Sequence, residues 1–204
     1  MGKFAVIFDE GGCSGGYSNE FAAAAPPPGV VRATRNDVVD VVDRDHVSRA
    51  DRRVSRVDEL WCDDSADDDT LWLLQQAYAG LRVIQISSVR EATIFDRGPR
   101  GWSLVKRLSL LQRRPGLTRP LFCAYWRDIH APMASCHRHV ARYVQNHVLD
   151  DSSSPFDGIA EFQITDLDGM RADYDTETAR AMKADVKNFA ATVSTYVVRE
   201  TSIR

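Results

Sequence analysis

The chain has few cysteines, no long apolar run and no excess of positive charge. Only four of its 204 residues are cysteines, and none of these lies in CxxC spacing. This spacing disfavours a zinc site and predicts free thiols in a reducing compartment. No apolar run approaches the roughly 18 residues that span a bilayer, and the start, MGKFAVIFDE, turns acidic too early for a signal peptide. The net charge of −3, without a basic block, disfavours nucleic acid as a partner. We therefore expect a cytoplasmic globular protein with no membrane or nucleic-acid partner.

The most informative segment, residues 103–148, predicts a strand, a tight turn, a helix and a second strand. Pro and Gly in Arg113–Gly116 favour the turn, since Pro fixes φ and Gly tolerates a positive φ. Thr118 suits the N-cap of the helix, with Pro120 in the first turn. Pro132 predicts the end of this helix. The residues expected on its apolar face are Leu121, Phe122, Tyr125, Trp126 and Ile129.

Two histidines of this segment are candidates for proton transfer, because imidazole titrates near neutral pH. His130 ends the apolar face of the predicted helix, and either it borders a pocket or it is a core histidine that is hydrogen-bonded to the backbone. His147 lies on the second strand, where period-two alternation places it on one face with Tyr143 and Gln145. That polar row either binds and protonates an enolate or phenolate, or it is satisfied by cross-strand hydrogen bonds.

Other polar groups carry weaker signals. Cys136, His137 and His139 stand close together in the sequence but lack a carboxylate partner, so a solvated loop is preferred over a metal site. The glycine-rich Gly11–Gly16 lacks the Lys-Ser/Thr of a phosphate-binding loop, and a flexible loop is expected there. The acidic cluster between Asp58 and Asp69 does not fit an EF-hand and is expected to precede and cap a helix.

The two halves of the chain resemble each other. Residues 57–62 resemble residues 159–164, each segment is followed by acids and a helical pattern, and residues 31–38 align with residues 141–148. Both halves therefore read as β-α-β-β-α-β, a ferredoxin-like unit. The predicted fold class is α+β, with two fused units, residues 1–100 and 101–204, whose sheets pair as in a dimeric α+β barrel.

The first unit is the degenerate one. Pro26–Pro28 would end any helix there after about two turns, and no His-Ala-Pro motif is present. Asp37 stands where the second unit has His147. We expect the first unit to be a packing partner and not a catalytic one.

The second unit, from about residue 103 to residue 200, resembles the EthD family of the dimeric α+β barrel superfamily. The order and spacing of several motifs carry the resemblance: Arg113–Thr118, Phe122, Trp126, His130–Pro132, Tyr143–His147 and Phe156–Glu161.

The resemblance implies a cofactor-independent enzyme of lyase or isomerase type, such as a cyclase, dehydratase or decarboxylase, acting on a small apolar, aromatic or polyketide-like substrate. His130 and His147 would be the catalytic residues. The substrate would be held by Tyr125, Trp126, Tyr143 and Gln145. The alternatives are a non-catalytic small-molecule binding protein, an anthrone-type monooxygenase and a haem protein. No metal is expected, and the fused pair of units is either a monomer that imitates a dimer or a homodimer.

Overall fold

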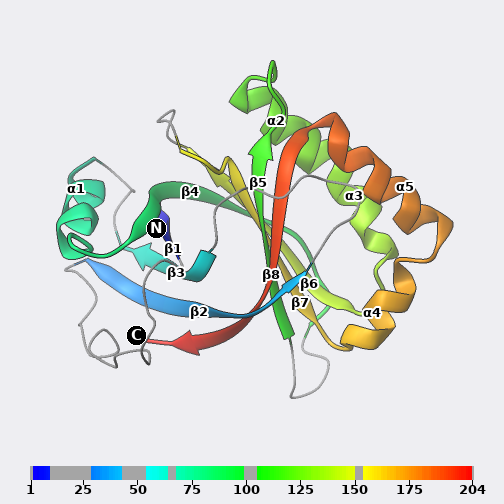
Figure 1. Cartoon of the computed structure of the whole chain (residues 1–204), viewed down its shortest axis with the longest axis horizontal. Helices are drawn as coiled ribbons and strands as arrows, with labels where there is room; N and C mark the ends of the chain where they lie inside the picture. The colour runs from blue at the N-terminus through cyan, green and yellow to red at the C-terminus, as the bar shows by residue number, and fades with distance from the viewer. Residues whose placement is uncertain are drawn as a thin grey trace.

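The computed structural model describes residues 2–9, 29–42, 54–63, 68–98, 105–149 and 154–203. Eight antiparallel strands in the order β1-β3-β2-β8-β5-β7-β6-β4 close into a barrel (Figure 1). The strands are β1 (Gly2–Asp9), β2 (Val30–Val42), β3 (Val54–Cys62), β4 (Val83–Asp96), β5 (Val105–Arg113), β6 (Val140–Val148), β7 (Gly158–Ile164) and β8 (Ala190–Ser202). The predicted α+β class is confirmed.

The two halves of the chain contribute four strands each, in the same spatial order. The first half runs β4-β1-β3-β2 and the second β8-β5-β7-β6, and the pairs β2–β8 and β4–β6 join them. Asn36 lies opposite Val57 in the first half, as Asn146 lies opposite Ile159 in the second. This register confirms the predicted alignment of residues 31–38 with residues 141–148.

The described helices cover the outside of the barrel. Those of the second half lie together on one side, while α1 lies at the other end, over the strands of the first half (Figure 1). The helices are α1 (Asp68–Ala77), α2 (Arg119–Tyr125), α3 (Ala131–Met133), α4 (Leu167–Asp173) and α5 (Glu177–Asp185). The predictions on Gly11–Gly16 and Pro26–Pro28 lie outside the described residues. None of the helices in the described ranges has the length and apolar character that a membrane span requires.

The helical segment between β5 and β6 begins as predicted but does not end as predicted. The Thr118 side chain accepts a hydrogen bond from the Leu121 amide, and Pro120 lies in the first turn. Pro132 was expected to end the helix, and this expectation is wrong. A π-helical turn, Trp126–His130, precedes α3, and the Ala131 amide bonds to the Trp126 carbonyl. The wider turn leads directly into α3. Pro132 lies in the first turn of α3, where a backbone amide is not needed as a hydrogen-bond donor.

The buried face of this segment is narrower than predicted. Phe122, Trp126 and His130 are buried, whereas Leu121 and Ile129 are 58% and 50% exposed. The three buried residues follow one another at intervals of four positions and form one row. Leu121 and Ile129 lie beside this row. The row faces the sheet of the second half, so it positions His130 between helix and sheet.

The barrel interior and the helix-facing surfaces form separate cores because strand residues alternate between the two sides. Leu108, Leu110, Ile159 and Tyr196 pack in the interior. Phe122, Trp126 and Phe189 pack on the helix-facing side of the second half. The candidate site lies in this outer layer.

Candidate functional site

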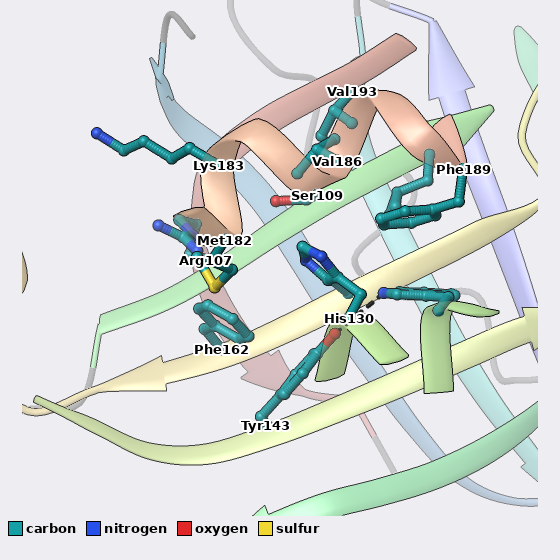
Figure 2. Close-up of a pocket in the computed structure, with 13 residues that line it drawn as sticks. Arg107, Ser109, His130, Tyr143, Phe162, Met182, Lys183, Val186, Phe189 and Val193 are labelled. Carbon is teal, nitrogen blue, oxygen red and sulfur yellow. Dashed lines mark hydrogen bonds between the residues drawn. The ribbon is translucent and has the colours of Figure 1, made fainter. Parts of the chain in front are cut away.

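A cavity of about 40 Å³ lies between the helices and the sheet of the second half. All of its lining residues fall between Arg107 and Val193, so this half alone supplies its walls among the described residues. Figure 2 shows His130 between the sheet that carries Ser109 and Phe162 and the helical segment that carries Met182 and Val186. This volume is small beside the roughly 300–1,000 Å³ of ligand-binding pockets. A ligand of aromatic size therefore requires the helices to move outward.

His130 and Asp185 form a buried pair at this cavity. His130 Nδ1 lies 2.9 Å from Asp185 Oδ2, and the imidazole packs 4.7 Å from the Phe189 ring, measured between centroids. A carboxylate can only accept hydrogen bonds, so the histidine proton lies on Nδ1 and the basic lone pair on Nε2. The pair has the geometry of a general base that is oriented by a carboxylate.

Asp185 is held ionised by three donors. Tyr125 Oη donates to Oδ1 at 2.6 Å and Asn188 Nδ2 donates to the same oxygen at 2.8 Å, while His130 approaches the other oxygen. Burial alone would raise the pKa of Asp185, but these hydrogen bonds bring it below its usual value. Tyr125 therefore contacts the carboxylate of the pair and is not among the residues that line the cavity.

Tyr143 lines the cavity and its hydroxyl accepts two hydrogen bonds. Trp126 Nε1 donates to it at 3.0 Å and Gln145 Nε2 at 2.8 Å. Gln145 also donates to the Trp126 carbonyl at 3.1 Å, which ties the strand to the π-helical turn. Because both donors use the oxygen's lone pairs, the Tyr143 hydroxyl acts toward further partners as a donor.

His147 lies outside the cavity, against Trp126. Its ring centroid is 4.8 Å from that of Trp126, and its Nε2 lies 3.0 Å from Gln145 Oε1. Burial, together with the positive charges of Arg127 and Arg90, lowers the pKa of His147 to about 4. The neutral ring donates from Nε2 to the amide oxygen, and its Nδ1 has no hydrogen-bond partner among the described residues. The expected common face of Tyr143, Gln145 and His147 is confirmed by this chain of bonds.

The other histidine candidates do not converge on a metal site. His137 is fully buried and packs 4.8 Å from Tyr174, and His139 Nδ1 lies 3.1 Å from Asp173 Oδ2. In the part of the chain that the structure describes, no group of three or more His, Cys, Asp or Glu side chains is arranged to hold a metal ion.

Two residues of the site were missed in the sequence. Asp185 follows Met182 by three positions, so it shares the buried face already expected for that helix, and this spacing was the available signal. Arg107, which is 5% exposed, lines the cavity from β5. Nothing in the sequence around Arg107, a charged residue in an otherwise apolar strand pattern, indicated that it would line the cavity.

Comparison with solved structures defines the class of fold. The whole chain is similar to an anthrone oxidase-like protein, with 12% identity, a TM-score of 0.58, and 99% of this chain and 92% of the other covered. A protein from Fusobacterium nucleatum named as a candidate monooxygenase has 11% identity, a TM-score of 0.54, and 100% and 92% coverage. One of the same description from Lactobacillus acidophilus has 6% identity, a TM-score of 0.51, and 98% and 94% coverage. These likenesses show a shared fold over the full length of the chain.

The family follows from the sequence of the second half. The family model of the EthD domain matches residues 114–192, which include the π-helical turn, His130 and Asp185. The match confirms the resemblance to the EthD family that the motifs of this half predicted. No curated protein matches the chain.

Proposed function

We propose that the protein is a small-molecule enzyme of the dimeric α+β barrel superfamily that removes a proton from an activated carbon of an aromatic or polyketide-like substrate. The observation that carries the proposal is the buried pair of His130 and Asp185 at a cavity with largely apolar walls. Acid–base groups that converge on an apolar cavity between helix and sheet are the usual composition of an active site.

In the first step, Nε2 of His130 takes the proton of a C–H group that is conjugated with a carbonyl. The electron pair of that bond moves through the conjugated system onto the carbonyl oxygen, which becomes an enolate or phenolate oxygen. Asp185 stabilises the imidazolium through Nδ1. Tyr143 donates its hydroxyl hydrogen to the enolate or phenolate oxygen. Return of the proton to another atom of the substrate gives isomerisation, and loss of a leaving group gives a lyase reaction.

His147 and Gln145 act in this scheme as positioning residues. His147 bonds to Gln145, and Gln145 bonds to the Tyr143 hydroxyl, so the row fixes the donor at the cavity. Trp126 donates to the same hydroxyl and also forms part of the cavity wall. The lyase or isomerase chemistry thus requires His130 directly and His147 through the orientation of Tyr143.

A second candidate reaction shares the same first step. The carbanion or phenolate formed from an anthrone can react with dioxygen, which would make the protein an anthrone-type monooxygenase. The similarity over 99% of the chain to an anthrone oxidase-like protein favours testing this outcome. Oxygen uptake distinguishes the two reactions.

The architecture supports a division of labour between the halves. We infer that the chain is a fusion of two ferredoxin-like units, residues 1–100 and 101–204, because the four strands of each half have the same order. Since the pairs β2–β8 and β4–β6 close the barrel within one chain, a homodimer would need another surface. Light scattering of the purified protein would measure its molar mass in solution and so distinguish a monomer from a homodimer.

The proposal is tested with anthrone as the probe. In D₂O without oxygen, the wild-type protein should accelerate exchange of the C10 protons, followed by NMR. Replacement of His130 by Ala should lower the exchange rate by about 10²–10⁴-fold. Replacement of His147 by Ala should lower it less. His139→Ala is the matched control, because His139 also pairs with an aspartate but lies outside the cavity.

Full exchange in both His130→Ala and His147→Ala would overturn the catalytic proposal. Binding of anthrone by the wild-type protein without any exchange would instead identify a non-catalytic binding protein. In air, oxygen uptake and formation of anthraquinone would assign the monooxygenase reaction.

A further inference from the structure

Arg107 is a buried positive charge at the cavity whose hydrogen-bond partners are neutral. It projects from β5 on the helix-facing side and is 5% exposed. Its Nη1 donates to Tyr174 Oη at 2.5 Å and lies 3.8 Å from Met170 Sδ. The guanidinium carbon lies 4.5 Å from the centroid of the Phe162 ring. None of these three groups carries a negative charge.

One edge of this guanidinium makes no hydrogen bond to the described residues. Nε is buried and has no hydrogen-bond partner, and neither Nε nor Nη2 donates to another of the described residues. No Asp or Glu oxygen in the described ranges lies within 4.0 Å of the guanidinium. The Nε–Nη2 edge is the one that binds a carboxylate through two parallel hydrogen bonds.

Burial makes the positive charge of Arg107 costly. Arginine does not lose its proton in proteins, so Arg107 stays charged in a low-dielectric layer. The Phe162 ring offsets only part of this cost, because a cation–π contact is weaker than an ion pair in the same surroundings. Buried charges are ordinarily paired, and an unpaired one at a cavity indicates a ligand of opposite charge.

A second positive charge stands beside the first. Lys183 lines the same cavity, and its Nζ lies 4.4 Å from the centroid of the Tyr174 ring, whose hydroxyl accepts the bond from Arg107. In Figure 2 the Lys183 ammonium points outward, whereas Arg107 lies beside Met182 and Phe162 on one side of His130. Among the described residues, Asp185 forms an ion pair with neither of them, and its oxygens accept bonds from Tyr125, Asn188 and His130.

We propose that the cavity binds an aromatic carboxylate, with the carboxylate on the Nε–Nη2 edge of Arg107 and the ring directed toward His130. The inference rests on the proposed function, because it assigns the substrate class of the same site. It gives the bound molecule a fixed direction: the anionic end at Arg107 and Phe162, the reactive carbon at His130. Lys183 at the outer side attracts the anion during entry.

The experiment compares 2-naphthoate with its neutral counterpart 2-naphthamide by isothermal titration calorimetry. The wild-type protein should bind the carboxylate about tenfold or more tightly than the amide, as expected for hydrogen bonds to a charged group. In Arg107→Gln this preference should fall below about twofold, and in Arg107→Lys part of it should remain. The matched control is Arg171→Gln, because Arg171 is exposed on α4 and pairs only with Asp168 among the described residues.

Each outcome decides one of the two proposals. Equal affinity of the wild-type protein for the two naphthalenes would overturn the inference on Arg107 and leave the proton-transfer function standing, as would a preference that survives in folded Arg107→Gln. Failure of both compounds to bind would overturn this inference, while the anthrone exchange assay would still decide the function. If Arg107→Gln does not fold, the wild-type ratio and Arg107→Lys give the answer: a reduced preference in Arg107→Lys supports the inference, and a preference as large as that of the wild-type protein would overturn the bidentate contact.

Discussion

Lys3 Nζ lies 3.1 Å from Glu161 Oε1, and this ion pair joins the two halves of the chain inside the barrel. In a matching pair the lysine comes from the second half and the glutamate from the first: Lys106 Nζ lies 2.6 Å from Glu59 Oε2. Each lysine also contacts the glutamate of its own half, Lys3 with Glu59 at 2.6 Å and Lys106 with Glu161 at 3.2 Å. Four buried charges therefore cross-link the two sheets, and the two lysines occupy matching positions in β1 and β5.

Replacement of Lys3 by Met should destabilise the barrel strongly. Glu59 and Glu161 would then share a single buried cation, Lys106, and removal of one partner from a buried ion pair costs about 3–5 kcal/mol. Adding Glu161→Gln should recover at least about 1 kcal/mol, because it removes the uncompensated charge. Urea unfolding of the single and double variants measures both values.

The exposed Lys187 provides the control, and its replacement by Met should change the unfolding free energy by less than about 0.5 kcal/mol. A double variant as unstable as Lys3→Met alone would show that the four charges do not act as a unit.

Replacement of Asp185 by Asn should impair proton transfer while the cavity is kept. The amide no longer fixes the histidine proton on Nδ1 and no longer stabilises the imidazolium, so the anthrone exchange rate should fall by about 10²–10⁴-fold. Asp173→Asn is a close control, because Asp173 holds His139 at 3.1 Å in a similar pair outside the cavity. Equal rates in the two variants would contradict the role of Asp185.

Gly158 allows Trp126 to pack directly on β7. A Cβ at residue 158 would lie closer to the Trp126 ring than real Cβ contacts do. We expect Gly158→Ala to cost about 1–3 kcal/mol by overpacking and to disturb the bond from Trp126 to Tyr143. Urea unfolding and near-UV circular dichroism would measure the two effects.

A smaller ring should relieve this strain. Gly158→Ala combined with Trp126→Phe should be less destabilised than the sum of the two single changes, because both act on one contact. Strict additivity would show that the Trp126 ring moves aside without cost.

Local features of the fold could be predicted from the sequence, because they depend on neighbouring residues. The Thr118 cap, the Pro120 position and the common face of Tyr143, Gln145 and His147 follow from spacing alone. The π-helical turn could not be predicted in this way. Pro132 was expected to stop the helix, and the wider turn before it depends on packing against the sheet.

The site itself was only half predictable. His130 was a candidate from its place on the helix, but its partner Asp185 lies 55 positions further along, on a different element. His147 and His130 share a segment, yet Trp126 packs against His147 and only His130 lines the cavity. Which side chains converge depends on how the helices cross the sheet, and no local pattern encodes that.

His147 should make the protein less stable in mild acid. Burial lowers its pKa to about 4 in the folded state, against an ordinary value of 6.5. Between these values the unfolded chain binds a proton that the folded protein does not, so stability falls as the pH drops from about 6.5 toward about 4. At pH 5 the loss relative to pH 8 is about 2 kcal/mol. In His147→Gln, which keeps a neutral polar side chain, this loss should be absent.

The measurement is the unfolding free energy of both proteins in urea at pH 8 and pH 5. Asp58, whose pKa is raised by burial to about 6, titrates in the same window with the opposite sign, since its folded form binds the proton first. Its contribution is the same in both proteins and cancels in the difference. If wild type and His147→Gln lose equal stability at pH 5, then His147 binds its proton equally well in the folded and the unfolded protein, and the predicted effect of its burial is wrong.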